Sequence, residues 1–205
     1  IVSVAVVGEV APGRALVRSG ARVGDRIAVT GSLGAAAGGL ALSRLQAGRA
    51  AEALSQPWGR ALIQALERPV ARLGEAQVLA RAGASAMMDL SDGLTKDLSR
   101  LCDASGVGAR VDLGAVPVSG PLASGAALLG VDARSLALSG GEDYELLVTM
   151  PADGVGRARD ELQTGFGMDL SELGEVTEGS GLIGVDAEGR ETVLEAAGWD
   201  HFAGG

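Results

Sequence analysis

The sequence has little cysteine and little histidine: one of each in 205 residues. A lone Cys102 excludes an internal disulfide, and one cysteine with one histidine cannot supply a zinc site of the usual four-ligand kind. His201 has no serine or cysteine nucleophile motif beside it, so a catalytic triad is unsupported. This cysteine usage predicts a cytoplasmic protein.

Aromatic residues and positive charge are also scarce. Only 2% of the residues are aromatic, so the core must be aliphatic and base stacking is not expected. Seventeen Lys and Arg against 26 Asp and Glu give a net charge of -9, the wrong sign for neutralising many phosphates. We therefore expect no nucleic-acid partner, and we expect metal ions to help if phosphate is bound.

No apolar run reaches the roughly 18 residues of a membrane span, and no signal peptide is recognisable, so no membrane association is predicted. The opening run, residues 1–10, is rich in β-branched residues but is interrupted by Glu9. We interpret it as a strand that enters from a missing N-terminal domain, because position 1 is not Met and already has strand character.

Glycine is abundant, at 33 of 205 residues, which indicates many tight turns or close backbone approaches. The order of elements predicts a mixed α/β fold in a single domain, residues 1–205, with a C-terminal tail at 195–205. Further strands are expected at 26–30, 85–89, 108–113 and 143–150, and helices at 33–46, 58–67, 72–82, 91–104 and 155–165. A small helical stretch should precede residue 143, and residues 170–194 should form a hairpin meander.

The segment Asp-Leu-Ser-Asp-Gly-Leu at residues 89–94, here the aspartate segment, lies where a predicted strand turns into a helix. Asp89 and Asp92 would face the unpaired amides at the helix start, where Mg²⁺ with a nucleotide could be held by hard oxygen ligands. The alternative is ordinary helix capping by Ser91 or Asp92. Spacing alone leaves both open.

The segment Ser-Gly-Gly-Glu-Asp-Tyr-Glu at residues 139–145, here the glycine-rich segment, runs directly into a predicted strand. Its paired glycines allow a close backbone approach that could present Glu142 or Asp143 to a ligand. A plain turn explains the glycines equally well.

Weaker candidates remain. Arg18 could grip a phosphate or simply be a solvated surface residue. Residues 30–34 look like a phosphate loop but lack the lysine and the glycine spacing, so we interpret them as a strand-to-helix turn. Trp199 could stack on a heterocycle or cover the core.

Taken together and in order, these segments resemble the thiamine-monophosphate kinase family. That family belongs to a superfamily with aminoimidazole ribonucleotide synthetase, selenophosphate synthetase and a hydrogenase-maturation protein. The matching stretches extend over the whole chain: residues 8–10, 12–16, 18–21, 24–25, 29–31, 89–94, 138–146 and 199–202. The resemblance implies the superfamily's C-terminal domain, a mixed sheet covered by helices.

The resemblance also implies an activity: transfer of the γ-phosphoryl group of ATP to thiamine monophosphate with Mg²⁺, giving thiamine diphosphate by direct in-line transfer. It assigns Asp89 and Asp92 to metal binding, and Ser91 and Arg18 to nucleotide contacts. No catalytic residue beyond metal and substrate positioning is implied.

On the substrate side, the resemblance assigns Glu142 to the thiamine moiety and Trp199 to an aromatic contact, a position that is often Tyr in the family. Nothing here corresponds to the family's N-terminal domain, which completes the site and forms a homodimer. We therefore expect the chain alone to be inactive. The alternatives are another ATP-dependent superfamily member or a non-catalytic binding module.

Overall fold

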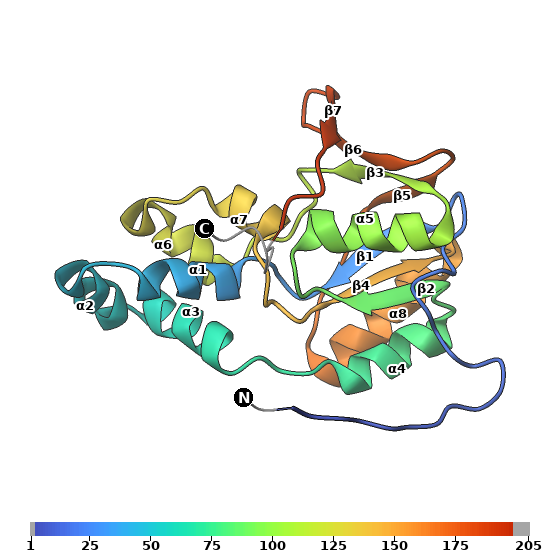
Figure 1. The fold of residues 1–205 in the computed structure, drawn as a ribbon, viewed down its shortest axis with the longest axis horizontal. Coiled ribbons are helices and arrows are strands. Elements are labelled where there is room, and N and C mark those ends of the chain that lie inside the picture. The colour runs from blue at the N-terminus through green and yellow to red at the C-terminus, as the bar shows by residue number, and fades with distance from the viewer. Residues whose placement is uncertain (1–2, 199–205) are drawn as a thin grey trace.

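The structure, a computed structural model, describes residues 3–198. In that part of the chain a seven-stranded sheet has the strand order β2-β4-β1-β5-β3-β6-β7 (Figure 1). In chain order the strands are β1 Arg26–Thr30, β2 Ala86–Asp89, β3 Gly108–Asp112, β4 Leu146–Met150, β5 Leu170–Thr177, β6 Gly181–Val185 and β7 Glu191–Leu194.

The sheet is mixed, as predicted. β3 and β6 pair in parallel, and the other neighbouring strands are antiparallel. The expected hairpin meander is right for β6 and β7 but wrong for β5 and β6, because β3 lies between them and pairs with both. Alternation along a strand shows which face is buried but does not identify the neighbouring strand.

Eight helices accompany the sheet over residues 3–198, and most of them match predicted segments. The second of them was not expected from the sequence. Their bounds are α1 Ala35–Ser43, α2 Ala47–Ser55, α3 Pro57–Glu67, α4 Leu73–Ala82, α5 Leu94–Ser105, α6 Gly120–Leu129, α7 Ala133–Ser139 and α8 Ala152–Phe166.

The helices cover both faces of the sheet (Figure 1). Helix α5 packs its leucines on one face, in a core cluster with Ile27 and Val29 of β1. Helices α4 and α8 cover the other face, where Ala28 of β1 points. A third cluster, centred on Leu62, joins α1, α2, α3 and α6 beside the sheet. Since both faces are covered, β1 is buried along almost its whole length.

Residues 3–25 form neither helix nor strand. The predicted strand at 1–10 is wrong for the described residues 3–10, where Val6 and Val7 are 89% and 98% exposed. A β-branched sequence favours extended backbone but becomes a strand only by pairing with a neighbour, and no described strand pairs with this segment. Within the described residues, no helix has the length and apolar character to cross a membrane.

Candidate functional site

The aspartate segment connects the end of β2 to the start of α5. Helix α5 begins at Leu94, and its N-cap is Gly93, with φ 115° and no side-chain cap. The capping alternative for Ser91 and Asp92 is therefore wrong. A Cβ atom on Gly93 would lie 2.7 Å from the carbonyl oxygen of Ser139, so this position requires glycine both for its backbone angle and for space.

The buried carboxylate of Asp97, in the first turn of α5, satisfies backbone amides just before the helix start. Its Oδ2 accepts hydrogen bonds from the amides of Ser91 and Asp92, each at 2.9 Å, and its Oδ1 contacts Arg100 Nη1 at 2.9 Å. The side chain is 0% exposed. Sequence reasoning missed Asp97, although an acid on the apolar face of α5, between Leu94 and Leu101, was a usable signal.

The two aspartates of the segment lie in different electrostatic surroundings. Asp92 Oδ2 is 2.6 Å from Arg100 Nη1 and 3.5 Å from Lys96 Nζ. Burial raises the pKa of Asp92, but its hydrogen bonds and charge attraction with Arg100 and Lys96 outweigh burial, so its pKa lies below the usual value. Asp89 is exposed, and no described residue forms a hydrogen bond or ion pair with its carboxylate.

The glycine-rich segment lies directly against the aspartate segment. The amides of Glu142 and Tyr144 donate to the carbonyls of Ser91 and Leu90, both at 2.9 Å, and the Leu90 amide donates to the carbonyl of Glu145 at 2.8 Å. A Cβ atom on Gly141 would lie 2.5 Å from the Ser91 oxygen. The close approach predicted for the paired glycines is thus present, between the two segments that sequence analysis had considered separately.

The acids of the glycine-rich segment have three different surroundings. Glu142 is exposed and has a left-handed backbone, with φ 71°, and the Tyr144 hydroxyl donates to its Oε2 at 3.2 Å. Asp143 turns inward and accepts hydrogen bonds from the amides of Gly34, at 2.7 Å, and Ala36, at 3.3 Å, at the start of α1. Of the two acids that sequence analysis offered to a ligand, only Glu142 remains exposed.

Burial raises the pKa of Asp143 to about 6, against the opposing effect of the Gly34 and Ala36 amides and with a contribution from the charge of Glu145. Residues 30–34 form a strand-to-helix turn between the end of β1 and the start of α1, as predicted. Asp143 accepts hydrogen bonds from the Gly34 amide in this turn and from the Ala36 amide just after it.

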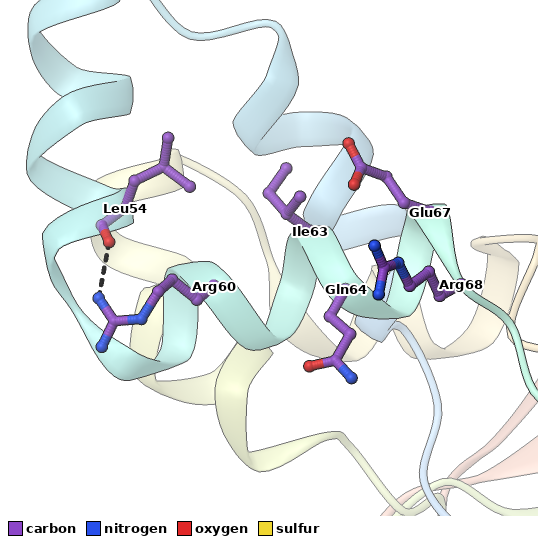
Figure 2. A pocket seen from close by; sticks show the side chains of 6 residues that line it. All are labelled: Leu54, Arg60, Ile63, Gln64, Glu67 and Arg68. Atoms are coloured by element: carbon purple, nitrogen blue, oxygen red, sulfur yellow. Dashed lines mark hydrogen bonds between the residues drawn. The ribbon is translucent and has the colours of Figure 1, made fainter.

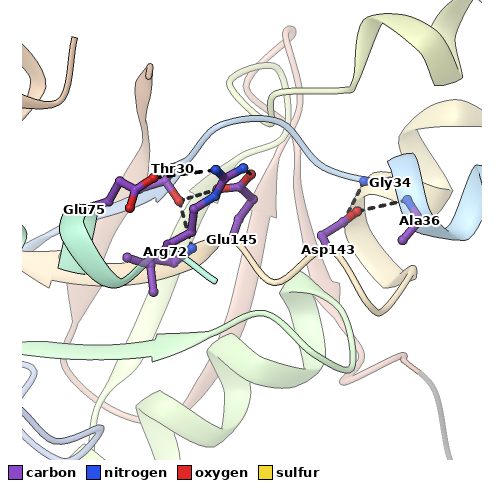
Figure 3. Close-up of polar contacts among 8 residues, drawn as sticks. Thr30, Gly34, Ala36, Arg72, Glu75, Asp143 and Glu145 are labelled. Atoms are coloured by element: carbon purple, nitrogen blue, oxygen red, sulfur yellow. Dashed lines mark hydrogen bonds and ion pairs between the residues drawn. The ribbon is translucent and has the colours of Figure 1, made fainter. Parts of the chain in front are cut away.

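Glu145 belongs to a buried network that joins the glycine-rich segment to β1 and to the loop before α4 (Figure 3). Its Oε2 accepts from the Thr30 hydroxyl at 2.7 Å, and its Oε1 lies 2.5 Å from Arg72 Nη2. Arg72 also faces Glu75, with 3.6 Å between Nη1 and Oε1. This network holds the end of the glycine-rich segment against β1 and Arg72.

Arg18 is not brought to the two segments. Its carbonyl accepts from the Ser105 hydroxyl at 3.1 Å, at the C-terminal end of α5. Helix α5 has 12 residues, so its C-terminal end lies about 18 Å from the aspartate segment at 1.5 Å per residue.

Trp199 lies outside the described residues. Residues 197 and 198, just before it, are described and lie against the start of α5. The Thr95 hydroxyl donates to the carbonyl of Ala197 at 2.7 Å. A Cβ atom on Gly198 would lie 2.3 Å from the Asp92 carbonyl oxygen, so the tail approaches the aspartate segment closely.

A cavity of about 330 Å³ lies elsewhere, along α3 and the end of α2 (Figure 2). It is lined by Leu54, Arg60, Ile63, Gln64, Glu67 and Arg68 and contains no residue of either segment. Arg60 Nη1 donates a hydrogen bond there to the Leu54 carbonyl at 2.9 Å.

Comparison with known proteins places the chain in a family. A model of the family "AIR synthase related protein, C-terminal domain" matches residues 22–199. The chain therefore belongs to this family of AIR synthase related proteins, and the match covers most of its length.

Similarity within the family points to one group of enzymes. The chain is 40% identical over 201 residues to a thiamine-monophosphate kinase of Salmonella typhimurium, and 35% identical over 201 residues to one of Aquifex aeolicus. These matches cover 96% and 98% of this chain but 58% of each relative. The chain thus spans a little over half the length of the curated relatives.

Solved structures agree. A structure described as AaThiL complexed with AMPPCP and TMP aligns with a TM-score of 0.72 at 33% identity, over 91% of this chain and 54% of that one. Thiamine-monophosphate kinase from Stenotrophomonas maltophilia aligns with a TM-score of 0.74 at 34% identity, over 89% of this chain and 56% of that one. The hydrogenase maturation protein HypE of E. coli shares the fold, at 18% identity and a TM-score of 0.66 over 90% of this chain and 54% of that one.

Proposed function

We propose that the chain is the C-terminal half of an ATP-dependent kinase that converts thiamine monophosphate into thiamine diphosphate with Mg²⁺. The observation that carries the proposal is the hydrogen-bonded pairing of the aspartate segment with the glycine-rich segment. It brings two carboxylates, a serine and the exposed Glu142 to one end of the sheet, beside the start of a helix. The similarity to thiamine-monophosphate kinases supports the choice of substrates.

The reaction makes modest chemical demands on these residues. The acceptor is a phosphate oxygen that is already anionic, so no general base is needed and no covalent intermediate has to form. The residues must instead hold two polyanions together in line and compensate their charge. The net charge of -9 is no obstacle to this if the acidic residues of the site hold cations.

Asp89 and Asp92 are the residues that would hold Mg²⁺. Asp89 fits this role, because carboxylate oxygens are the ligands Mg²⁺ prefers and Asp89 is exposed without a partner among the described residues. Asp92 would have to share its carboxylate with Arg100 and Lys96, which already face its Oδ2. Residues 3–198 contain no group of three or more His, Cys, Asp or Glu placed to hold a metal. One or two carboxylates suffice for Mg²⁺ when water and phosphate supply its other ligands. Bound there, Mg²⁺ would neutralise charge on phosphate oxygens.

The remaining contacts follow from position. Ser91 lies between the two aspartates, where its hydroxyl can contact the nucleotide. Glu142 offers an exposed carboxylate to the cationic ring of thiamine, and we retain Trp199 as an aromatic contact. Arg18 could contact the nucleotide only if residues 3–25 follow a different path in the complete protein, or if it serves another copy. We propose a homodimer formed through an N-terminal domain.

The test is phosphorylation of thiamine monophosphate by the complete protein in the presence of ATP and Mg²⁺. Replacing a metal ligand removes several kcal/mol of charge stabilisation, and each 1.36 kcal/mol is a tenfold change in rate. Asp89→Asn should therefore lower kcat/KM by about 10²-fold or more. Asp103→Asn, an exposed aspartate near the other end of α5, is the matched control and should leave the rate unchanged. Equal rates for wild type and Asp89→Asn would contradict the proposal.

A further inference from the structure

Asp97 contacts the aspartate segment through Oδ2 and Arg100 through Oδ1. Its Oδ2 accepts the amides of Ser91 and Asp92, and its Oδ1 accepts from Arg100, all at 2.9 Å. The carboxylate is completely buried, so these donors take the place of water. A single buried side chain therefore fixes the consecutive amides of Ser91 and Asp92.

The same backbone is held from the other side by the glycine-rich segment. The Leu90 and Ser91 carbonyls accept the amides of Tyr144 and Glu142. The amides of Ser91 and Asp92 thus bond to Asp97, while the carbonyls of Leu90 and Ser91 bond to the glycine-rich segment. With both sets of backbone groups engaged, the segment has little freedom to rotate its peptide planes.

Asp97 also acts on the Asp92 side chain through Arg100. Arg100 Nη1 lies 2.9 Å from Asp97 Oδ1 and 2.6 Å from Asp92 Oδ2. The guanidinium is partly exposed, so on its own it could adopt other orientations. Its bond to the buried Asp97 fixes the orientation in which it meets Asp92.

We propose that Asp97 is the positioning residue of the phosphoryl-transfer site, setting the backbone at Ser91 and Asp92 and, through Arg100, the Asp92 carboxylate. The inference rests on the proposed function. Asp97 does not touch substrate. Its carboxylate cannot be replaced by an amide without loss, because asparagine keeps one acceptor oxygen and turns an NH₂ group toward donors.

The first test is Asp97→Asn in the complete enzyme, measured as the Mg²⁺ concentration that gives half-maximal rate. Partners that orient metal ligands are worth about 10–100-fold in metal affinity or activity. We expect the half-saturating Mg²⁺ concentration to rise by about tenfold or more. Asp25→Asn is the matched control, because Asp25 is also buried and accepts a backbone amide, that of Arg22 at 2.9 Å, at the opposite end of the sheet. It should lower the melting temperature without changing the Mg²⁺ dependence.

The second test is amide hydrogen exchange on this chain, which does not depend on kinase activity. Asp97→Asn should speed exchange at Ser91 and Asp92 by about tenfold or more, since both amides exchange a charged acceptor for a neutral one and the asparagine NH₂ group then faces Arg100. Asp25→Asn should leave these two amides unchanged. If the wild-type enzyme makes no thiamine diphosphate, the proposed function fails, while the exchange experiment still judges the role of Asp97.

Should Asp97→Asn not fold, Asp97→Glu retains the charge but moves the oxygens by one methylene. It should still raise the half-saturating Mg²⁺ concentration and speed exchange at Ser91 and Asp92. Wild-type Mg²⁺ dependence and wild-type exchange in a folded variant would overturn the proposal, and so would a variant that only melts at a lower temperature, as Asp25→Asn should.

Discussion

Replacing Asp143 by asparagine should change how the stability of the chain depends on pH. Burial raises the pKa of Asp143 from 3.8 to about 6, despite the amides of Gly34 and Ala36 that lower it. The folded state therefore binds this proton more tightly than the unfolded state does. Protonated Asp143 stabilises the fold, and this stabilisation is fully present below pH 3.8 and is lost as the pH rises through 6. The asparagine side chain cannot titrate, so the variant should lack this loss.

The magnitude follows from the pKa difference. At about 1.36 kcal/mol per pKa unit, the stabilisation that is lost on ionisation of Asp143 is at most about 3 kcal/mol. Partial exposure of Asp143 reduces this value, so we expect a loss of about 1–3 kcal/mol. Urea unfolding followed by circular dichroism at pH 4, 5, 6 and 7 measures it. The unfolding free energy of wild type, minus that of Asp143→Asn, should fall by this amount from pH 4 to pH 7.

All other titrating groups are shared by the two proteins and largely cancel in the difference. Asp160→Asn, which removes an exposed carboxylate on α8, is the control for the loss of one side-chain charge. A difference for Asp143→Asn that stays flat, or that rises with pH, would refute the reasoning, because Asp143 would then ionise at least as readily in the folded chain as in the unfolded one.

Two further outcomes test the packing around the site and the core. Gly93→Ala should cost about 1–3 kcal/mol of stability, because a left-handed backbone and a contact with the Ser139 carbonyl both oppose the methyl group. Gly106→Ala also has a positive φ but meets open space, so its smaller loss in thermal melting is the reference; equal losses would argue against the clash. Cys102 should resist alkylation at pH 8 until denaturant is added, since it is 1% exposed and burial raises its pKa to about 11. Rapid labelling of the folded chain would contradict that burial.

Local patterns predicted the elements whose own residues specify them. The spacing of Leu94, Leu98 and Leu101 predicts α5, and the strand character of residues 26–30 predicts β1. Helix α2 was missed because its apolar face consists mostly of alanine, and Ala53 is its only buried residue.

The errors concern partners, which a local pattern does not encode. Residues 3–10 have a strand composition without a strand to pair with, and β5 pairs with β3 rather than with β6. In the site, the aspartate and glycine-rich segments were recognised separately. Their contact depends on β2 and β4 being neighbours, a tertiary fact. Asp97 was overlooked although its place on the apolar face of α5 was a signal of burial; which amides it accepts is again a tertiary fact.

We propose that Asp89 and Asp92 bind a nucleotide through Mg²⁺. Calorimetric titration of the complete protein with a non-hydrolysable ATP analogue, with and without Mg²⁺, tests it most directly. We expect binding that requires Mg²⁺ and that is weakened by at least about tenfold in Asp89→Asn. Equal affinity with and without Mg²⁺, in wild type and Asp89→Asn alike, would contradict it.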